Sequence, residues 1–384
     1  MFAAPLFAIS LWTVAKAIAV LVCALVAFLV LQMIHLYAVL AWGDVRTRGT
    51  NYYGLSPADR QRFKTLLYYH RLILSPVIAL LSRGARFDIT KIGFTYRGVA
   101  GPLGTCSPES FQKAAERQPR AGDVFVATQM KCGTTWMQHV VYQVLTRGAG
   151  DLVESETALY SFSPWIESLR SISIDNAPLV GAERPSRIIK THMPVELCPY
   201  AAEAKYIYVV RHPVSCFASC ADFLATNAGA FAADLETIET WFRSETYMWW
   251  GTWPAHVQGW WKRSQEHSNV LFVSFEEMKT DLPATIRRVA DLLEIRDLNE
   301  EEIGKIAHKC GFGYMRDHED LFEMNPPHVL QSRSALFVSG KVDRHKDVPE
   351  DVRQRILTWC NSEMSGSDFP LGKYYPAVAA AGSK

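Results

Sequence analysis

The stretch DVFVATQMKCGTTWMQHV, residues 123–140, decides the fold because it joins a buried strand to a helix through a short polar loop. Its apolar run ends at a loop that holds Lys131 and Gly133, and a helical apolar pattern begins after Thr134. A helix N-terminus offers unpaired backbone N–H groups and a partial positive charge, and glycine allows a ligand close to the backbone. We therefore expect this loop to hold a phosphate or a similar anion.

Further short runs rich in β-branched and aromatic residues follow, and longer segments with helical apolar spacing separate them. The predicted strands are 123–128, 186–192, 205–211 and 270–275, and a predicted helix covers 281–294. This alternation predicts a doubly wound α/β domain with a mainly parallel sheet. Ligands bind such sheets at the carboxyl ends of the strands. The residues at these ends include Lys131, Lys190, His192 and Arg211.

Length, charge and cysteine spacing narrow the function classes. The chain has 384 residues and a formal net charge of +1, so we expect one large domain with attachments and no nucleic-acid partner. The eight cysteines include no C-x-x-C pair, which argues against a disulfide framework or a structural zinc site. We expect no metal.

The N-terminal region contains a long apolar segment. Residues 17–42 contain no Asp, Glu, Lys or Arg. As a helix they would be about 39 Å long, more than the ~30 Å hydrocarbon core of a bilayer. A single membrane span is favoured over a secretory signal, whose apolar region is shorter, and over a buried helix. The span is followed by more cations than precede it, so the positive-inside tendency places the rest of the chain in the cytoplasm, with a luminal orientation as the alternative.

The segments around the predicted sheet divide the chain into three parts. Residues 1–43 are the expected membrane anchor, and residues 44–110 a juxtamembrane connector. Within the connector, the apolar stretch 66–81 is either a helix on the membrane surface or a helix packed on the domain. The α/β domain is expected at 111–375. Its aromatic segment 240–262 is expected mainly in the core, with some residues lining a pocket.

Four segments, in order, resemble the cytosolic type of the sulfotransferase family. QMKCGTTW (129–136) is similar to the family's phosphosulfate loop P-K-S-G-T-T-W and differs from a Walker A motif, in which lysine follows the last glycine. RIIKTHMP (187–194) resembles the segment with the family's catalytic histidine, and KYIYVVRHPVSCFAS (205–219) resembles its 3′-phosphate segment. WPAHVQGWW (253–261), followed by VLFVSFEEMKTD (270–281), resembles the stretch that ends in Y-E-D-M-K-x-D.

The resemblance implies that domain 111–375 moves a sulfuryl group from 3′-phosphoadenosine 5′-phosphosulfate (PAPS) to an acceptor hydroxyl or amine. It implies His192 as the base, Lys131 as the stabiliser of the bridging oxygen and Lys190 as the stabiliser of the transferring group. The residues that it assigns to the nucleotide are Lys131, Cys132, Gly133, Thr134, Thr135, Trp136, Arg211, Ser219, Phe275, Phe312, Gly340 and Lys341.

Several positions depart from the family pattern. Cys132 replaces the usual loop serine, and its place at a helix N-terminus beside Lys131 predicts a lowered thiol pKa and redox-sensitive nucleotide binding. Gln129 and Met130 stand where the family has Tyr-Pro, which we interpret as a change of loop shape. Phe275 replaces a tyrosine, so one hydrogen bond to the nucleotide is expected to be lost.

The C-terminal part of the resemblance is incomplete. In FVSGKVDRHKD (337–347) Gly340 aligns, but the family's preceding arginine and lysine do not. Lys341, Arg344 and Arg333 are the candidates to replace them. The family's dimerisation stretch is not recognisable, so the oligomeric state is left open.

Two other functions are kept as alternatives. An ATP-dependent phosphotransferase would need an acidic Mg²⁺ site at a strand end, where only Glu276 and Glu277 follow the last predicted strand. A nucleotide-binding membrane protein without turnover would keep the pocket, but the presence of all three implied catalytic residues argues against it. The membrane anchor favours a small-molecule or lipid acceptor, and segments 160–180 and 220–250 carry no motif that identifies it.

Overall fold

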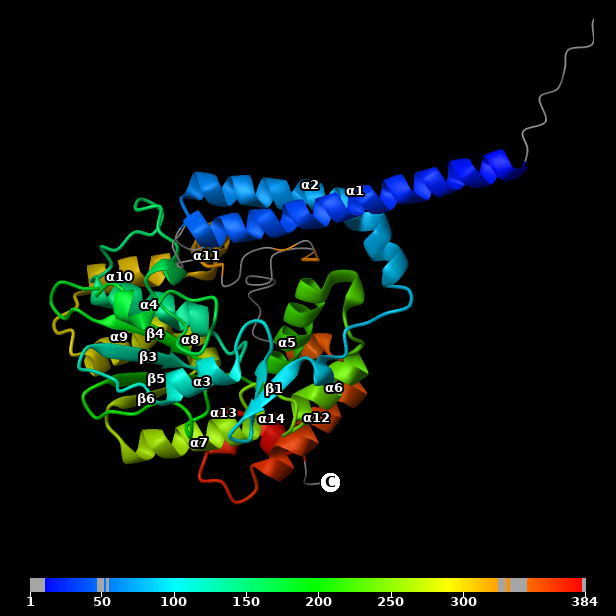
Figure 1. Ribbon diagram of the computed structural model, residues 1–384. Helices are drawn as coiled ribbons and strands as arrows, with labels where there is room; N and C mark the ends of the chain where they lie inside the picture. Colours follow the sequence, from blue (N-terminus) through cyan, green and yellow to red (C-terminus); the bar gives the residue numbers. More distant parts are fainter. Residues whose placement is uncertain are drawn as a thin grey trace, which may run out of the picture.

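The computed structural model describes residues 11–46, 52, 55–323, 328, 330–331 and 344–381. A four-stranded sheet lies at the centre of the α/β domain (Figure 1). Its strands lie in the order β4 (Arg187–Thr191), β3 (Asp123–Ala127), β5 (Lys205–Val210) and β6 (Val270–Ser274). All three strand pairings are parallel, which confirms the predicted sheet, and each strand boundary lies within one residue of its prediction.

Both faces of the sheet are covered, because successive side chains of each strand enter opposite hydrophobic clusters. Phe125 and Tyr206 belong to one cluster, and Val124 and Ile207 belong to the other. Helices α4 (Thr134–Leu145) and α9 (Leu282–Leu293) pack on the second face, and α7 (Trp253–Glu266) packs beside β6 in the first cluster. The doubly wound α/β prediction is therefore confirmed.

The other elements extend these two layers. The helices are α3 (Pro108–Ala115), α5 (Pro213–Ala228), α6 (Leu235–Arg243), α8 (Phe275–Thr280), α10 (Glu300–Lys309), α11 (Phe312–Asp317), α12 (Glu350–Glu363), α13 (Leu371–Tyr374) and α14 (Pro376–Ala379). Helix α9 shows why the local sequence folds this way, since Asp281 caps its N-terminus and its buried residues recur at helical spacing.

The end of the predicted connector packs against the domain. Strands β1 (Gly93–Tyr96) and β2 (Val99–Pro102) form an antiparallel hairpin, and Ala100 of β2 pairs with Trp249. Ala100 and Cys106 both lie in the hydrophobic cluster of the first sheet face. The hairpin therefore contributes to the core that supports the sheet, a role that the connector interpretation of residues 44–110 did not include.

Two long helices, α1 (Leu11–Arg46) and α2 (Pro57–Leu81), lie side by side at the top of Figure 1. Within α1, the stretch Leu11–Ile34 is long and apolar enough to cross a membrane, and none of it is buried. Helix α2 buries one stripe of side chains, including Phe63 and Leu67, while apolar residues of its other side, including Leu72, are exposed. Packing on the domain therefore accounts for one face of α2 only.

Candidate active site

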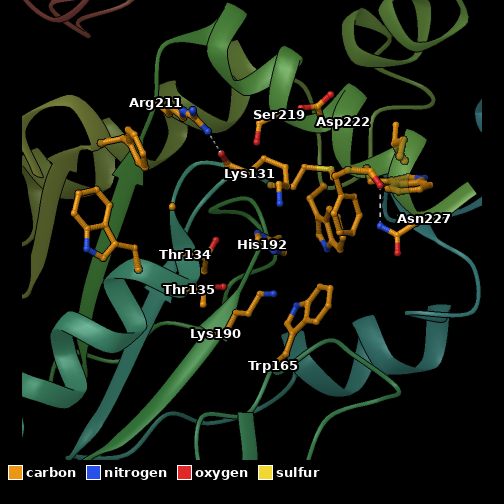
Figure 2. Close-up of a pocket in the computed structure, with 18 of the residues that line it drawn as sticks. Lys131, Thr134, Thr135, Trp165, Lys190, His192, Arg211, Ser219, Asp222 and Asn227 are labelled. Atoms are coloured by element: carbon orange, nitrogen blue, oxygen red, sulfur yellow. Dashed lines mark hydrogen bonds between the residues drawn. The ribbon is translucent and has the colours of Figure 1, made fainter. Parts of the chain in front are cut away.

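The loop between β3 and α4 has the backbone of an anion-binding turn. Lys131 and Gly133 have positive φ values of 63° and 105°. A Cβ atom at Gly133 would lie 2.8 Å from the ring of Phe275, so a side chain is excluded there by both conformation and space. The loop borders a cavity of about 350 Å³ at the carboxyl ends of the central strands (Figure 2).

The three residues assigned to catalysis line this one cavity (Figure 2). Lys190 is fully buried, and its Nζ lies 3.7 Å from the centre of the Trp165 ring. Burial lowers the pKa of Lys190 to about 7, although the negative charge of Glu167 acts in the opposite direction. Burial also lowers the pKa of Lys131 to about 8, and the positive charges of Arg211 and Arg344 add to this effect. Because burial disfavours the charged form of each lysine, a nearby anion that stabilises the charged form is favoured in the cavity.

The hydrogen bonds of His192 fix its tautomer. Its Nδ1 lies 2.9 Å from the carbonyl oxygen of Thr128, which can only accept, so Nδ1 carries the proton and Nε2 keeps its lone pair. Burial, followed by the charge of Lys190, lowers the pKa of His192 well below its usual value. The ring is therefore neutral and able to accept a proton at Nε2.

The residues assigned to the nucleotide surround the same cavity. Ser219, Trp136 and Phe312 line it, as do Gly133, Thr134, Thr135, Arg211 and Phe275. The Arg211 guanidinium lies 4.4 Å from the centre of the Phe275 ring and donates to the Lys131 carbonyl oxygen at 3.0 Å. Its Nε is buried without a hydrogen-bond partner within the described part of the chain. Phe275 therefore packs on the arginine in the position where the family has a tyrosine.

The expectation for the Cys132 thiol is wrong. Its side chain is buried beneath the loop, 3.6 Å from the sulfur of Cys216 on α5, and it does not line the cavity. Burial raises the pKa of Cys132 well above its usual value. Hydrogen bonds from Cys132 and Cys220 instead lower the pKa of Cys216. The Cys132 thiol therefore points into the core and away from the cavity.

The C-terminal candidates divide into two groups. Gly340, Lys341 and Arg333 lie outside the described residues. Arg344 lines the cavity and forms an ion pair with Asp222 of α5, which also lines it (Figure 2). Because Ser219 and Asp222 are one turn apart on α5, Arg344 lies on the side of the cavity that holds Ser219.

Sequence reasoning missed several residues around the site. Gln129 donates from Nε2 to the carbonyl oxygens of Trp249 and Gly251, both at 3.1 Å, so it does more than alter loop shape. Trp165, Trp249 and Trp250 line the cavity. The tryptophan density of 240–262 had indicated this role for some of its members, but no local pattern indicated Trp165.

The acidic residues near the last strand do not form a metal site. The Glu276 carboxylate accepts hydrogen bonds from the His212 backbone N–H at 3.0 Å and the Tyr375 hydroxyl at 3.2 Å. Among the described residues, no group of three His, Cys, Asp or Glu side chains is arranged to hold a metal ion. The ATP-dependent alternative is not favoured.

Comparisons with known proteins agree with this geometry. The family model of the sulfotransferase domain matches residues 121–368. Sulfotransferase 2B1 of Mus musculus is 30% identical over 270 residues, covering 67% of this chain and 76% of the relative. Sulfotransferase 1E1 of Mus musculus is 27% identical over 248 residues, covering 62% of this chain and 81% of the relative.

Solved structures share the fold. The crystal structure of mouse sulfotransferase SULT7A1 complexed with PAP (3′-phosphoadenosine 5′-phosphate) matches with a TM-score of 0.58 at 23% identity, covering 74% of this chain and 100% of that chain. Retinol dehydratase in complex with androsterone and inactive cofactor PAP matches with a TM-score of 0.57 at 18% identity, covering 74% and 96%. The family match covers well over half of the chain. The chain therefore belongs to the sulfotransferase family and is an enzyme that transfers a sulfuryl group from PAPS to an acceptor.

Proposed function

We propose that His192 is the general base that removes the proton from the acceptor hydroxyl or amine. The observation that carries this proposal is its neutral ring, with Nε2 unprotonated, in the same cavity as two lysines of lowered pKa. Burial lowers the pKa of His192, and the negative charge of a bound nucleotide would raise it. A base in this position contributes ~10²–10⁴ to the rate.

Lys131 and Lys190 stabilise the charge that moves during transfer. Lys131, in the loop, stabilises the bridging oxygen that leaves sulfur, and Lys190 stabilises the oxygens of the transferring group. Burial favours the neutral form of each lysine, and an anion beside them favours the charged form. Nucleotide binding and protonation of these lysines are therefore coupled.

The residues present fit a nucleotide with phosphate-like groups at both ends of its ribose. The loop offers backbone N–H groups from Gly133 to Trp136 to the 5′-phosphosulfate, with the Thr134 and Thr135 hydroxyls beside them. Arg211, with its unpartnered Nε, holds the 3′-phosphate together with Ser219. Trp136 and Phe312 contact the adenine.

Among the three candidates for the missing 3′-phosphate contact, we assign Arg344. It lines the cavity, and its positive charge acts on Lys131 together with that of Arg211, so this side of the cavity favours an anion. Asp222 holds the Arg344 guanidinium through an ion pair. Gly340 and Lys341 stay as predictions for the same group.

The acceptor is a hydrophobic small molecule that carries a hydroxyl or an amine. The cavity wall around His192 is built from Trp165 and Trp250, whose ring centres lie 5.3 and 4.9 Å from the imidazole. Leu103, Phe223 and Leu224 extend this apolar wall. A related fold, retinol dehydratase, is solved in complex with androsterone and in complex with retinol, and such apolar acceptors suit a wall of this kind.

The chain is anchored by α1 as a single span, with the catalytic domain in the cytoplasm. The apolar, exposed stretch Leu11–Ile34 and the arginines that follow it support this arrangement. The exposed apolar side chains of α2, which include Tyr68, Tyr69, Leu72, Leu80 and Leu81, are suited to contact the membrane surface. This location supplies lipid-dissolved acceptors.

The test is incubation of the purified full-length chain with PAPS labelled in its sulfur and with a membrane lipid extract. Labelled product is expected with the wild type and is expected to be lost with His192→Ala and with Lys131→Ala. Chromatography of the product identifies the acceptor. Equal labelling by the wild type and both variants would contradict the assignment of the base and the lysine.

A further inference from the structure

Glu167 is a fully buried carboxylate without an assigned role, and it lies against the catalytic strand. One of its oxygens accepts a hydrogen bond from the backbone N–H of His192 at 2.7 Å, and the other accepts from the Thr191 hydroxyl at 3.0 Å. Burial raises the pKa of Glu167, and the hydrogen bond from His192 opposes that rise. Because both oxygens accept from donors, this environment suits the ionised form.

The segment that carries Glu167 is held beside the end of β4 by an isolated parallel β-bridge. The Lys190 backbone N–H donates to the Pro164 carbonyl oxygen at 2.8 Å, and the Ile166 N–H donates to the Lys190 carbonyl oxygen at 3.0 Å. Trp165 pairs with Lys190 in this bridge, and its ring covers the Lys190 ammonium. The Ser110 hydroxyl fixes the Glu167 carbonyl oxygen at 2.7 Å. Glu167 therefore belongs to a segment that is fixed to the end of β4 by hydrogen bonds.

The Glu167 carboxylate offsets part of the cost of a positive charge on the buried Lys190. Burial and the positive charge of Lys131 both oppose the ammonium form of Lys190, while Glu167 favours it. Cys106 also faces Lys190, but burial raises the pKa of its thiol well above the usual value, so this thiol is neutral and brings no compensating charge. His192 and Tyr160 also lie near Lys190, and both are neutral, because burial lowers the pKa of His192 and raises the pKa of Tyr160.

We propose that Glu167 is a positioning residue that keeps Lys190 in its ammonium form and fixes the backbone of His192. The inference rests on the roles proposed above for Lys190 and His192. Sulfuryl transfer requires a positive charge at Lys190, and burial of this side chain opposes that charge. The negative charge of the Glu167 carboxylate offsets part of this cost, and Glu167 is not among the residues that line the cavity.

The test is the affinity of the full-length chain for PAPS, in the absence of an acceptor, as a function of pH, measured by calorimetry in detergent micelles. Glu167→Gln keeps the size of the side chain and a carbonyl oxygen that can accept a hydrogen bond, but it removes the charge. The pH at which affinity begins to fall is expected to shift downward by about one unit or more. Glu167→Asp, which keeps the charge, is expected to keep the wild-type position of this fall even if its affinity is lower.

Two further variants separate the electrostatic role from structural damage. In a Lys190→Met background, Glu167→Gln is expected to cause no additional pH shift, because the group that it acts on is absent. Glu239→Gln is the matched control, since Glu239 is also a buried carboxylate but pairs with Arg243 and Arg355, away from the cavity. It is expected to leave the pH dependence unchanged.

Three results would overturn the inference. If Glu167→Gln leaves the pH dependence of affinity unshifted while the wild type binds PAPS normally, this inference is overturned and the proposed function stands. A shift of equal size in the Lys190→Met background, or in Glu239→Gln, would show that the effect is not transmitted through Lys190. Failure of the wild type to bind PAPS would overturn the proposed function, and this inference with it.

Discussion

The Nδ1 atom of His192 lies 2.9 Å from the carbonyl oxygen of Thr128, so the residue that follows β3 orients the ring that follows β4. Thr128 also bonds through its hydroxyl to the Thr134 hydroxyl, at 2.6 Å, at the start of α4. Thr128 therefore connects His192 to the loop between β3 and α4. This relationship leaves Nε2 as the proton acceptor of the ring, with a backbone carbonyl rather than a carboxylate at Nδ1.

Replacement of His192 by alanine is expected to lower kcat by ~10²–10⁴, because it removes the proton acceptor. Affinity for PAP is expected to stay close to that of the wild type, since the loop and Arg211 are retained. The measurement is the rate of label transfer from PAPS, with PAP affinity determined separately by calorimetry. His308→Ala, an exposed histidine on α10, is the control. A variant that keeps wild-type kcat would exclude His192 as the base.

Binding of PAP at pH 8 is expected to take up protons. Burial lowers the pKa of Lys131 from 10.5 to about 8 in the ligand-free chain, so a large fraction of this lysine is neutral at that pH. The nucleotide's phosphates favour the ammonium, which raises the pKa on binding. Affinity should therefore fall as pH rises through 8. Calorimetry in two buffers of different ionisation enthalpy measures the uptake, and Lys131→Met should reduce it. Proton release, or the same uptake in the variant, would contradict the assignment.

Mild oxidation is expected to join Cys132 to Cys216. Their sulfurs lie 3.6 Å apart, and hydrogen bonds from Cys132 and Cys220 lower the pKa of Cys216, so Cys216 is the more acidic of the two thiols. Peroxide takes two electrons and two protons from the two thiols and is reduced to water as the disulfide forms. The bond would pull the loop toward α5 and weaken PAP binding. Mass spectrometry detects the bond, and a thiol reductant should restore affinity. If wild type and Cys132→Ser respond equally to peroxide, the prediction is wrong.

Loss of the Gln129 amide is expected to loosen the part of the cavity wall around His192 that includes Trp250. Its two hydrogen bonds hold segment 249–251, where Trp250 has a positive φ of 62° that costs on the order of 1–3 kcal/mol for a residue other than glycine. Gln129→Met should therefore raise the KM for the acceptor while leaving PAP affinity near its wild-type value. Gln265→Met, at an exposed position, is the control. An unchanged acceptor KM would refute this role.

The sequence was most informative where structure is local. The strands, the helix after Thr134 and the loop with Lys131 and Gly133 were predictable, because a buried strand, a glycine and a helix start are adjacent in the chain. The direction of the Cys132 thiol was not predictable, because it depends on the packing of α5. Glu167 was not found for a similar reason, since its role arises from pairing with a strand more than twenty residues away.

The membrane-proximal helices illustrate the same limit. The apolar character of α1 was evident from its composition, whereas the two faces of α2 were not separated by composition. The buried stripe of α2 follows from contacts with the domain, and its exposed apolar face is visible only once that stripe is assigned. Of the three candidates Lys341, Arg344 and Arg333, only Arg344 lies among the described residues, and it lines the cavity.

The most direct measurement of the central claim compares three nucleotides by calorimetry on the purified wild-type chain. If the cations at the rim of the sheet recognise a 3′-phosphate as well as a 5′-phosphate, PAP should bind at least about tenfold more tightly than adenosine 5′-monophosphate. ATP should not compete with it. Absence of PAP binding, or equal affinity for PAP and ATP, would contradict the account.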